Sequence, residues 1–213
     1  MKKILFILVS LIIISCSKDD KSEAYYNFRD DDFNKLVSFE LNEIITYENQ
    51  FGDEIFYEVN EVTIDYKKQL SRGSWVTPGS IKWFYYDAKK VKMNSDFTNF
   101  IITYKFQRFP INVELAKENK YTEYPSEFYG RVDLFLWNGL DYNGVSINYE
   151  SNSETMTIDG VDYKNVYTIQ SNNPNPIITS SGVEKNIHKI YYSKKQGVIG
   201  FDDLDNVQWR IVN

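Results

Sequence analysis

The chain has 213 residues, of which 42% are hydrophobic and 16% aromatic, and 24 Lys and Arg against 30 Asp and Glu give a formal net charge of −6. This composition excludes a disordered protein, and the acidic charge gives no drive toward nucleic acid, so no nucleic-acid partner is expected. With one Cys and one His, the chain cannot build a disulfide framework, a thiolate zinc site or a multi-histidine metal site, and we expect neither a metal nor another cofactor.

The amino-terminal residues have the pattern of a signal peptide. A short basic region, MKK, precedes residues 4–14, which are apolar except for one serine. The apolar run has the length of a signal-peptide core and is shorter than the about 20 residues that span a bilayer. We therefore assign residues 1–15 as a signal peptide.

The apolar run ends in the sequence IISC, which resembles the lipobox of bacterial lipoproteins. The resemblance implies cleavage between Ser15 and Cys16, a thioether-linked diacylglycerol on the Cys16 sulfur, and acylation of the new amino terminus by fatty acids such as palmitate. Several acyl chains hold a protein almost permanently at a membrane. The SKDD that follows is similar to the export signal of surface lipoproteins of Bacteroidota. We expect a lipid anchor in the outer membrane, with the protein at the cell surface.

Residues 16–34 are charged and show no sustained period, so we interpret them as a lipidated tether. If flexible, a tether of this length has a root-mean-square reach of roughly 20–25 Å. The acidic triplet at residues 30–32 is interpreted as a turn or helix start rather than a Ca²⁺ site. Residues 35–213 are then expected to form a single β domain.

From residue 37 onward, hydrophobic and polar residues mostly alternate, which is typical of half-buried strands. A change of phase at Asn60 predicts a β-bulge or tight turn. The Asp159-Gly160 pair predicts a two-residue hairpin turn. Strands are expected near residues 37–47, 55–66, 81–86, 100–106, 132–136, 145–149, 156–170, 187–201 and 207–211, with one or two helical turns within 113–119.

Short links and the lack of alternating helices argue against parallel βαβ units. The prediction is an all-β fold, a single antiparallel meander curled into a sandwich, a barrel or an open half-barrel, with little helix. The carboxy-terminal KIYYSKKQGVIGFDDLDNVQWRI (residues 189–211) resembles the closing hairpins of surface lipoproteins of Bacteroidota, which implies a shared fold. It is also similar to the half-barrels of periplasmic lipoprotein carriers. Those carriers are soluble shuttles, so their role does not transfer to a chain lipidated at Cys16.

Catalytic constellations are weak in this sequence, and we assign no catalytic residue. His188 is the only imidazole, and no Gly-x-Ser-x-Gly motif offers it a nucleophile, although Ser193 and Ser71 stay open. Two carboxylates suffice for glycoside hydrolysis. The acids nearest an aromatic region are Glu114, Glu123, Glu127 and Asp133. In a chain with 30 acids, such spacing is no evidence of a catalytic pair, and solvated positions in loops and strands explain these acids better.

Aromatic side chains outside a core stack on sugar rings or anchor protein partners. On this basis Trp75, Trp137 and Tyr124 are the candidate ligand-binding residues. We expect a non-enzymatic lipoprotein that is held at the membrane by its anchor and binds a glycan or a protein. The alternatives are a lipid-handling or envelope-assembly protein with an open half-barrel, a glycan hydrolase, and an immunity lipoprotein.

Overall fold

The computed structural model describes residues 23–70, 83–95, 100–118, 123–139 and 144–212. The predicted signal peptide, Ser15, Cys16 and Trp75 lie outside these ranges. Within them, no helix is long and apolar enough to cross a membrane. The elements are β1 (Tyr25–Tyr26), α2 (Asp30–Phe33), β2 (Ile44–Asn49), β3 (Glu54–Leu70), β4 (Trp83–Ser95), β5 (Ile101–Pro110), α3 (Val113–Glu118), β6 (Ser126–Leu134), β7 (Val145–Ser146), β8 (Glu154–Ile158), β9 (Val161–Gln170), β10 (Ile177–Ile178), β11 (Glu184–Lys185), β12 (Ile187–Ser193), β13 (Gly197–Asp203) and β14 (Gln208–Ile211).

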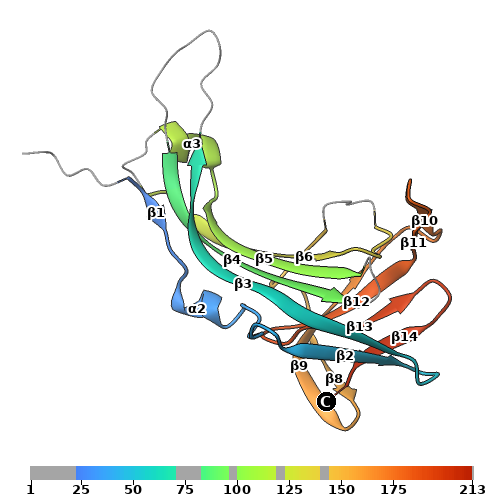
Figure 1. The fold of residues 1–213 in the computed structure, drawn as a ribbon. Helices are drawn as coiled ribbons and strands as arrows, with labels where there is room; N and C mark the ends of the chain where they lie inside the picture. Colours follow the sequence, from blue (N-terminus) through green and yellow to red (C-terminus); the bar gives the residue numbers. More distant parts are fainter. Residues whose placement is uncertain (1–22, 71–82, 96–99, 119–122, 140–143, 213) are drawn as a thin grey trace, which may run out of the picture.

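The predicted all-β class is confirmed, and of the three architectures considered the chain adopts the half-barrel. One large sheet has the strand order β7-β6-β5-β4-β3-β2-β14-β13-β12-β9-β8, and β1 pairs with β4 off this path. The sheet curls strongly across its width (Figure 1). Two meanders make up the sheet, because the last strand, β14, pairs antiparallel with β2 and joins them. The termini of the β fold therefore meet in the middle of the sheet rather than at its edges.

Two local predictions in the strands are confirmed. β3 runs without a break from Glu54 to Leu70, and its register against β4 shifts between Val59 and Glu61, which is the predicted bulge. The hairpin between β8 and β9 turns at Asp159 and Gly160, whose φ angles are 50° and 81°. Two successive positive φ angles are typical of the type I′ turn, whose twist matches that of the flanking strands.

The main core lies on the inner face of the half-barrel and is rich in tyrosine. Tyr47, Tyr57, Tyr104 and Tyr192 are at most 1% exposed. Their rings fill a core that contains little leucine, and two of the hydroxyls bind one residue of β13. The Tyr47 hydroxyl donates to the carbonyl of Val198 (2.7 Å), and the Val198 N–H donates to the Tyr104 hydroxyl (3.1 Å). These hydrogen bonds satisfy polar atoms that burial has removed from water.

The prediction of a tether over residues 16–34 is wrong for its second half. Residues 24–39, which we call the strap, are packed into the fold, and the strand expected from residue 37 begins only at Ile44. The apolar side chains that bury the strap in the main core are Phe28, Leu36, Val37 and Phe39. Some of the charged side chains that suggested a solvated tether lie inside the fold, since Asp32 is fully buried against Arg108. The concave face is thus filled by the protein's own chain.

A second, smaller core lies where β3, β4 and β5 extend beyond the rest of the sheet and curve toward α3, a region that we call the arm (Figure 1). Phe84, Tyr86 and Ala88 of β4 pack there with Tyr26 and with Ala116 of α3. The predicted helical turns at 113–119 are confirmed by α3. Because these β4 residues alternate with Lys89 and Val91, which point to the inner face, the second core covers the opposite, outer face of the sheet.

Candidate functional site

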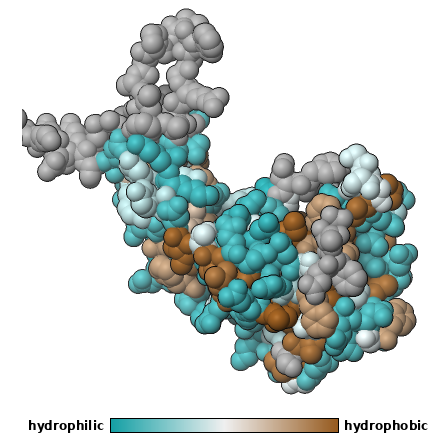
Figure 2. Space-filling view, in the orientation of Figure 1, coloured by the Kyte–Doolittle hydropathy of each residue, from teal (hydrophilic) through white to brown (hydrophobic). Residues whose placement is uncertain are grey.

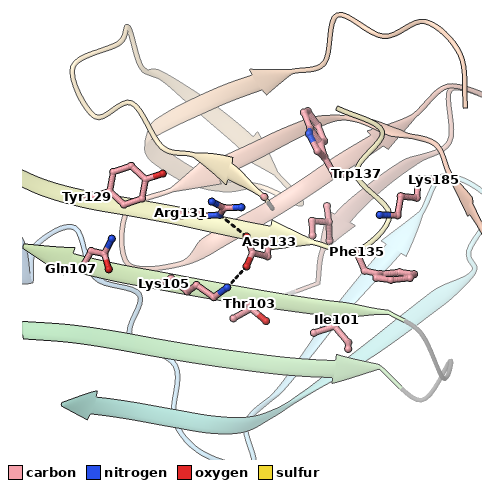
Figure 3. A pocket seen from close by; sticks show the side chains of 12 residues that line it. Ile101, Thr103, Lys105, Gln107, Tyr129, Arg131, Asp133, Phe135, Trp137 and Lys185 are labelled. Carbon is pink, nitrogen blue, oxygen red and sulfur yellow. Dashed lines mark hydrogen bonds and ion pairs between the residues drawn. The ribbon is translucent and has the colours of Figure 1, made fainter. Parts of the chain in front are cut away.

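The outer face of β5 and β6 carries a trough of about 600 Å³ (Figure 3). The lining of the trough follows from the alternation of side chains along each strand, which point in turn to the two faces of the sheet. Ile102, Tyr104 and Phe106 of β5 enter the main core, so the intervening side chains point outward. The described residues that line the trough are Ile101, Thr103, Lys105 and Gln107 of β5, Tyr129, Arg131, Asp133 and Leu134 of β6, and Phe135, Trp137, Gly144 and Lys185. In Figure 2 the surface is hollowed between the arm and the rest of the molecule.

The floor of the trough is a fixed polar network. Arg131 Nε donates to Asp133 Oδ1 (2.7 Å), and Lys105 Nζ donates to Asp133 Oδ2 (2.5 Å). Figure 3 shows the three side chains joined in this order across the two strands. The Tyr129 hydroxyl forms a 2.5 Å hydrogen bond with Ser146 of β7 at one side. One carboxylate therefore holds two cationic side chains in place at the trough.

An aromatic wall closes one end of the trough. Phe135 and Trp137 follow β6 directly, and Lys185 Nζ lies 5.1 Å from the centre of the Phe135 ring. The loop is fixed by backbone contacts, since Trp137 forms an isolated bridge with Ile187 and the N–H of Asn138 donates to the Ile187 carbonyl. A Cβ atom at residue 139 would lie 1.9 Å from Trp137 Nε1, so glycine is required for the indole to pack there.

A second groove of about 620 Å³ adjoins the trough and shares Trp137 and Gly144 with it. Its other described lining residues are Gly139, Val145, Ser146, Ile169, Gln170, Ser171, Asn172, Asn173 and Pro174. Beneath it, Asn138 is fully buried and donates its side-chain amide to the carbonyl of Asn173. The trough and the second groove therefore meet at one tryptophan and offer a path longer than either alone.

The structure separates the predicted ligand-binding residues. Trp137 lies between the two grooves, but it is only 7% exposed and belongs to the main core, so it contributes a small part of its ring to each. Tyr124 is half-buried against the second core at the arm and does not line the trough. Trp75 lies outside the described residues. Of the three predicted residues, Trp137 is therefore the one that the structure places at the trough, where the trough meets the second groove.

The residues considered for catalysis do not converge. His188 and Ser193 lie on the same strand, β12, five positions apart, which places their Cα atoms roughly 16 Å from each other. Ser71 lies outside the described residues. Among the described residues that line the trough, Asp133 is the one carboxylate, whereas glycoside hydrolysis uses two. In the described part of the chain, no group of three or more His, Cys, Asp or Glu side chains is arranged to hold a metal ion.

The acidic segment near the carboxyl end, residues 202–206, is a turn. Asp203 Oδ1 accepts the backbone N–H groups of Asp205 and Val207, which closes the link from β13 to β14. Burial raises the pKa of Asp203 above its usual value, although these two hydrogen bonds oppose the effect. Asp202 is occupied as well, since it accepts a hydrogen bond from Arg210 (2.7 Å). These carboxylates stabilise the turn.

Comparison with known proteins gives no relative. No family model matches this chain, and no curated protein and no solved structure matches it. The function is therefore argued from the site alone.

Proposed function

We propose that this protein is an outer-membrane lipoprotein that binds a glycan in the trough on the outer face of β5 and β6. The single observation that supports this is the composition of the trough, a row of fixed polar side chains that ends at an aromatic wall. Sugars present hydroxyl groups at their edges and apolar C–H faces, so they are bound by planar polar groups together with aromatic rings. Gln107 and Arg131 supply the planar polar groups, and Phe135 supplies the aromatic ring.

Two of the alternatives find less support in the described residues. A carrier of lipid needs an open apolar concavity, but here the strap fills the inner face with Leu36, Val37 and Phe39. A glycan hydrolase needs a second carboxylate near Asp133. Binding without turnover is therefore the proposal, and the lipid anchor at Cys16 places the binding domain at the membrane surface.

The anchor is tested by Cys16→Ser in the full chain. We expect the wild-type protein to incorporate an alkyne analogue of palmitate and to partition into Triton X-114. The variant should remain in the aqueous phase and incorporate no label, because only a thiol can form the thioether. Equal labelling of both proteins would contradict lipidation at Cys16. Protease treatment of intact cells then tests the outward orientation, since a surface domain is digested before the outer membrane is opened.

The binding site is tested by filling the trough without changing its charge. Gln107→Trp places a large ring on the trough floor, and Thr168→Trp places the same ring on an exposed position of β9 as a control. The full chain, in non-ionic detergent, is run through gels that contain neutral polysaccharides (dextran, xyloglucan, mannan) or acidic ones (polygalacturonate, alginate).

We expect the wild-type protein and Thr168→Trp to be retarded by at least one polysaccharide. Gln107→Trp should bind that polysaccharide at least about tenfold more weakly. A tenfold change in affinity corresponds to about 1.4 kcal/mol of binding free energy, which is the size of one good contact. The proposed function would be wrong if no polysaccharide retards the wild-type protein, or if both variants bind equally well.

A further inference from the structure

Large side chains that the core does not absorb gather on the inner face of the arm. Tyr66 and Ile64 of β3 are 64% and 65% exposed, and Tyr25 of β1 is 46% exposed. The rings of Tyr66 and Tyr85 lie 5.9 Å apart, measured between their centres, and Tyr25 is the cross-strand partner of Tyr85. These four residues, Tyr25, Ile64, Tyr66 and Tyr85, form a continuous surface that we call the tyrosine patch.

The tyrosine patch is held in place by one carboxylate. Tyr66 is the cross-strand partner of Asp87, which is two residues from Lys89 on β4 and so points to the same inner face. Asp87 Oδ2 accepts the backbone N–H of Phe28 in the strap (2.7 Å), and its other oxygen accepts the Tyr25 hydroxyl. The patch is therefore a fixed surface at the point where the strap meets the arm.

The position of the patch is defined relative to the predicted lipid anchor, because Tyr25 lies nine residues after Cys16. An extended chain spans at most about 3.6 Å per residue, so Tyr25 can lie no more than about 32 Å from a lipidated Cys16. By comparison, β3 has 17 residues and a length of roughly 55 Å. Figure 1 shows β1 along the arm. The arm is therefore the end of the sheet that the anchor keeps nearest to the bilayer.

We infer that the tyrosine patch docks on the surface of the membrane that carries the lipid anchor. The inference rests on the proposed anchor at Cys16 and adds a protein surface to it. Tyrosine is enriched at membrane–water interfaces, because its ring is apolar and its hydroxyl forms hydrogen bonds in the headgroup region. The anchor makes the contact intramolecular, so a weak affinity of the patch for lipid is sufficient.

Docking through the patch would also orient the trough. The patch lies on the inner face of β3 and β4, whereas the trough lies on the outer face of the neighbouring strands β5 and β6. The two faces of a sheet point in opposite directions. A membrane that contacts the patch therefore leaves the trough open on the side away from the bilayer, where it is accessible to a polysaccharide.

The test measures how close single labels lie to the lipid in vesicles that carry the lipidated full chain. The chain has one Cys, and the thioether consumes its thiol, so an introduced Cys is the reactive one. Ile64→Cys carries a fluorescent label in the patch. Ile178→Cys is the matched control, because Ile178 is 62% exposed and lies on β10, away from the arm (Figure 1). The vesicles contain phosphatidylethanolamine and phosphatidylglycerol, with or without a nitroxide on the acyl chain.

We expect the nitroxide lipid to quench the label at residue 64 several-fold more strongly than the label at residue 178. Iodide in the aqueous phase should quench the two labels in the opposite order. Adding Tyr66→Gln to the Ile64→Cys chain should remove most of the quenching by lipid, because it replaces an interfacial ring with a polar amide. Tyr66 is exposed, so this change leaves the core intact.

Flotation of the vesicles on a density gradient separates the failure of this inference from the failure of the anchor. A chain that floats with the vesicles but shows equal quenching by lipid at residues 64 and 178 would overturn the docking and leave the lipid anchor standing. Lipid quenching that Tyr66→Gln leaves unchanged would also overturn the docking through the patch. A chain that does not float with the vesicles would overturn both the docking and the anchor.

Discussion

Raising the pH above about 10 should unfold this protein over a narrow range. Burial raises the pKa of Tyr47 and Tyr192 well above their usual value of 10.0, and it raises the pKa of Tyr57 and Tyr104 in the same direction. In the folded state these hydroxyls keep their protons where the unfolded chain would release them. The stability they contribute is therefore complete below pH 10 and is lost as the pH rises from 10 toward the raised values.

The expected slope is steep. Each of these four groups contributes about 1.4 kcal/mol per pH unit within that window, and a domain has a free energy of unfolding of about 5–15 kcal/mol. Lys89 acts in the opposite direction, because burial lowers its pKa, but it is one group against four. Within one to two pH units above 10, the fold should therefore be lost.

The measurement is phenolate absorbance at 295 nm together with far-ultraviolet circular dichroism during an alkaline titration. We expect the buried tyrosines to ionise in one step with the loss of β structure. Tyr192→Phe is a matched variant, because the Tyr192 hydroxyl has no hydrogen-bond partner among the described residues. It should leave stability at pH 7 nearly unchanged and flatten the pH dependence by about 1.4 kcal/mol per pH unit. Gradual ionisation of these four buried tyrosines near pH 10, with the sheet intact, would contradict the tyrosine core.

Arg108→Met should lower the free energy of unfolding by about 3–5 kcal/mol. Arg108 is 6% exposed and binds Asp32 with both sides of its guanidinium, Nε to Oδ2 (2.7 Å) and Nη2 to Oδ1 (2.9 Å). Burial by itself would raise the pKa of Asp32, but hydrogen bonds from Arg108 and from the Arg29 backbone N–H outweigh it and hold that pKa below its usual value. Without Arg108, a fully buried carboxylate loses its partner.

Two comparisons make this second prediction specific. The double variant Asp32→Leu with Arg108→Met removes both charges and should recover much of the loss, since the penalty arises from a lone buried charge. Lys90→Met breaks the half-exposed pair with Glu61 and should cost less than about 1 kcal/mol. Urea unfolding of the full chain in detergent measures all three. An equal, small loss for Arg108→Met and Lys90→Met would show that the strap is not held by this pair.

The local structure of this chain was predictable because it depends on neighbouring residues. The Asp159-Gly160 turn requires positive φ angles that these two residues adopt easily, and the bulge after Val59 appears in the sequence as a change of phase. The same is true of α3. The curl into a half-barrel follows from pairings between distant strands, such as β14 with β2, and was therefore one of three architectures compatible with the sequence.

The strap shows where the sequence pattern misleads. The alternation of Val37 and Phe39 with polar residues is the same in a strand and in an extended segment that crosses a sheet, so the prediction of a strand there was wrong. The acidic triplet was interpreted as a turn or helix start, and α2 begins there, but the partner of Asp32, Arg108, is 76 residues away. Such a pairing has no local signature, and a charged segment was interpreted as a tether.

The trough was missed for a related reason. Thr103, Lys105 and Gln107 form the polar half of an ordinary alternating strand, which by itself indicates a solvated face. Only the register of β5 and β6 places Lys105 beside Arg131. Trp137 was found because aromatic residues are conspicuous, but its main role is in the core.

The most direct test of the central claim is to label lysines covalently with and without a polysaccharide that retards the protein in the gels, and to quantify each site by mass spectrometry. The claim is that a glycan lies in the trough on the outer face of β5 and β6. We predict that this polysaccharide at saturation protects Lys105 and Lys185, which line the trough, several-fold and leaves the exposed Lys164 of β9 unchanged. Unchanged labelling of Lys105 and Lys185 at saturation, or protection confined to lysines outside the trough, would contradict the account.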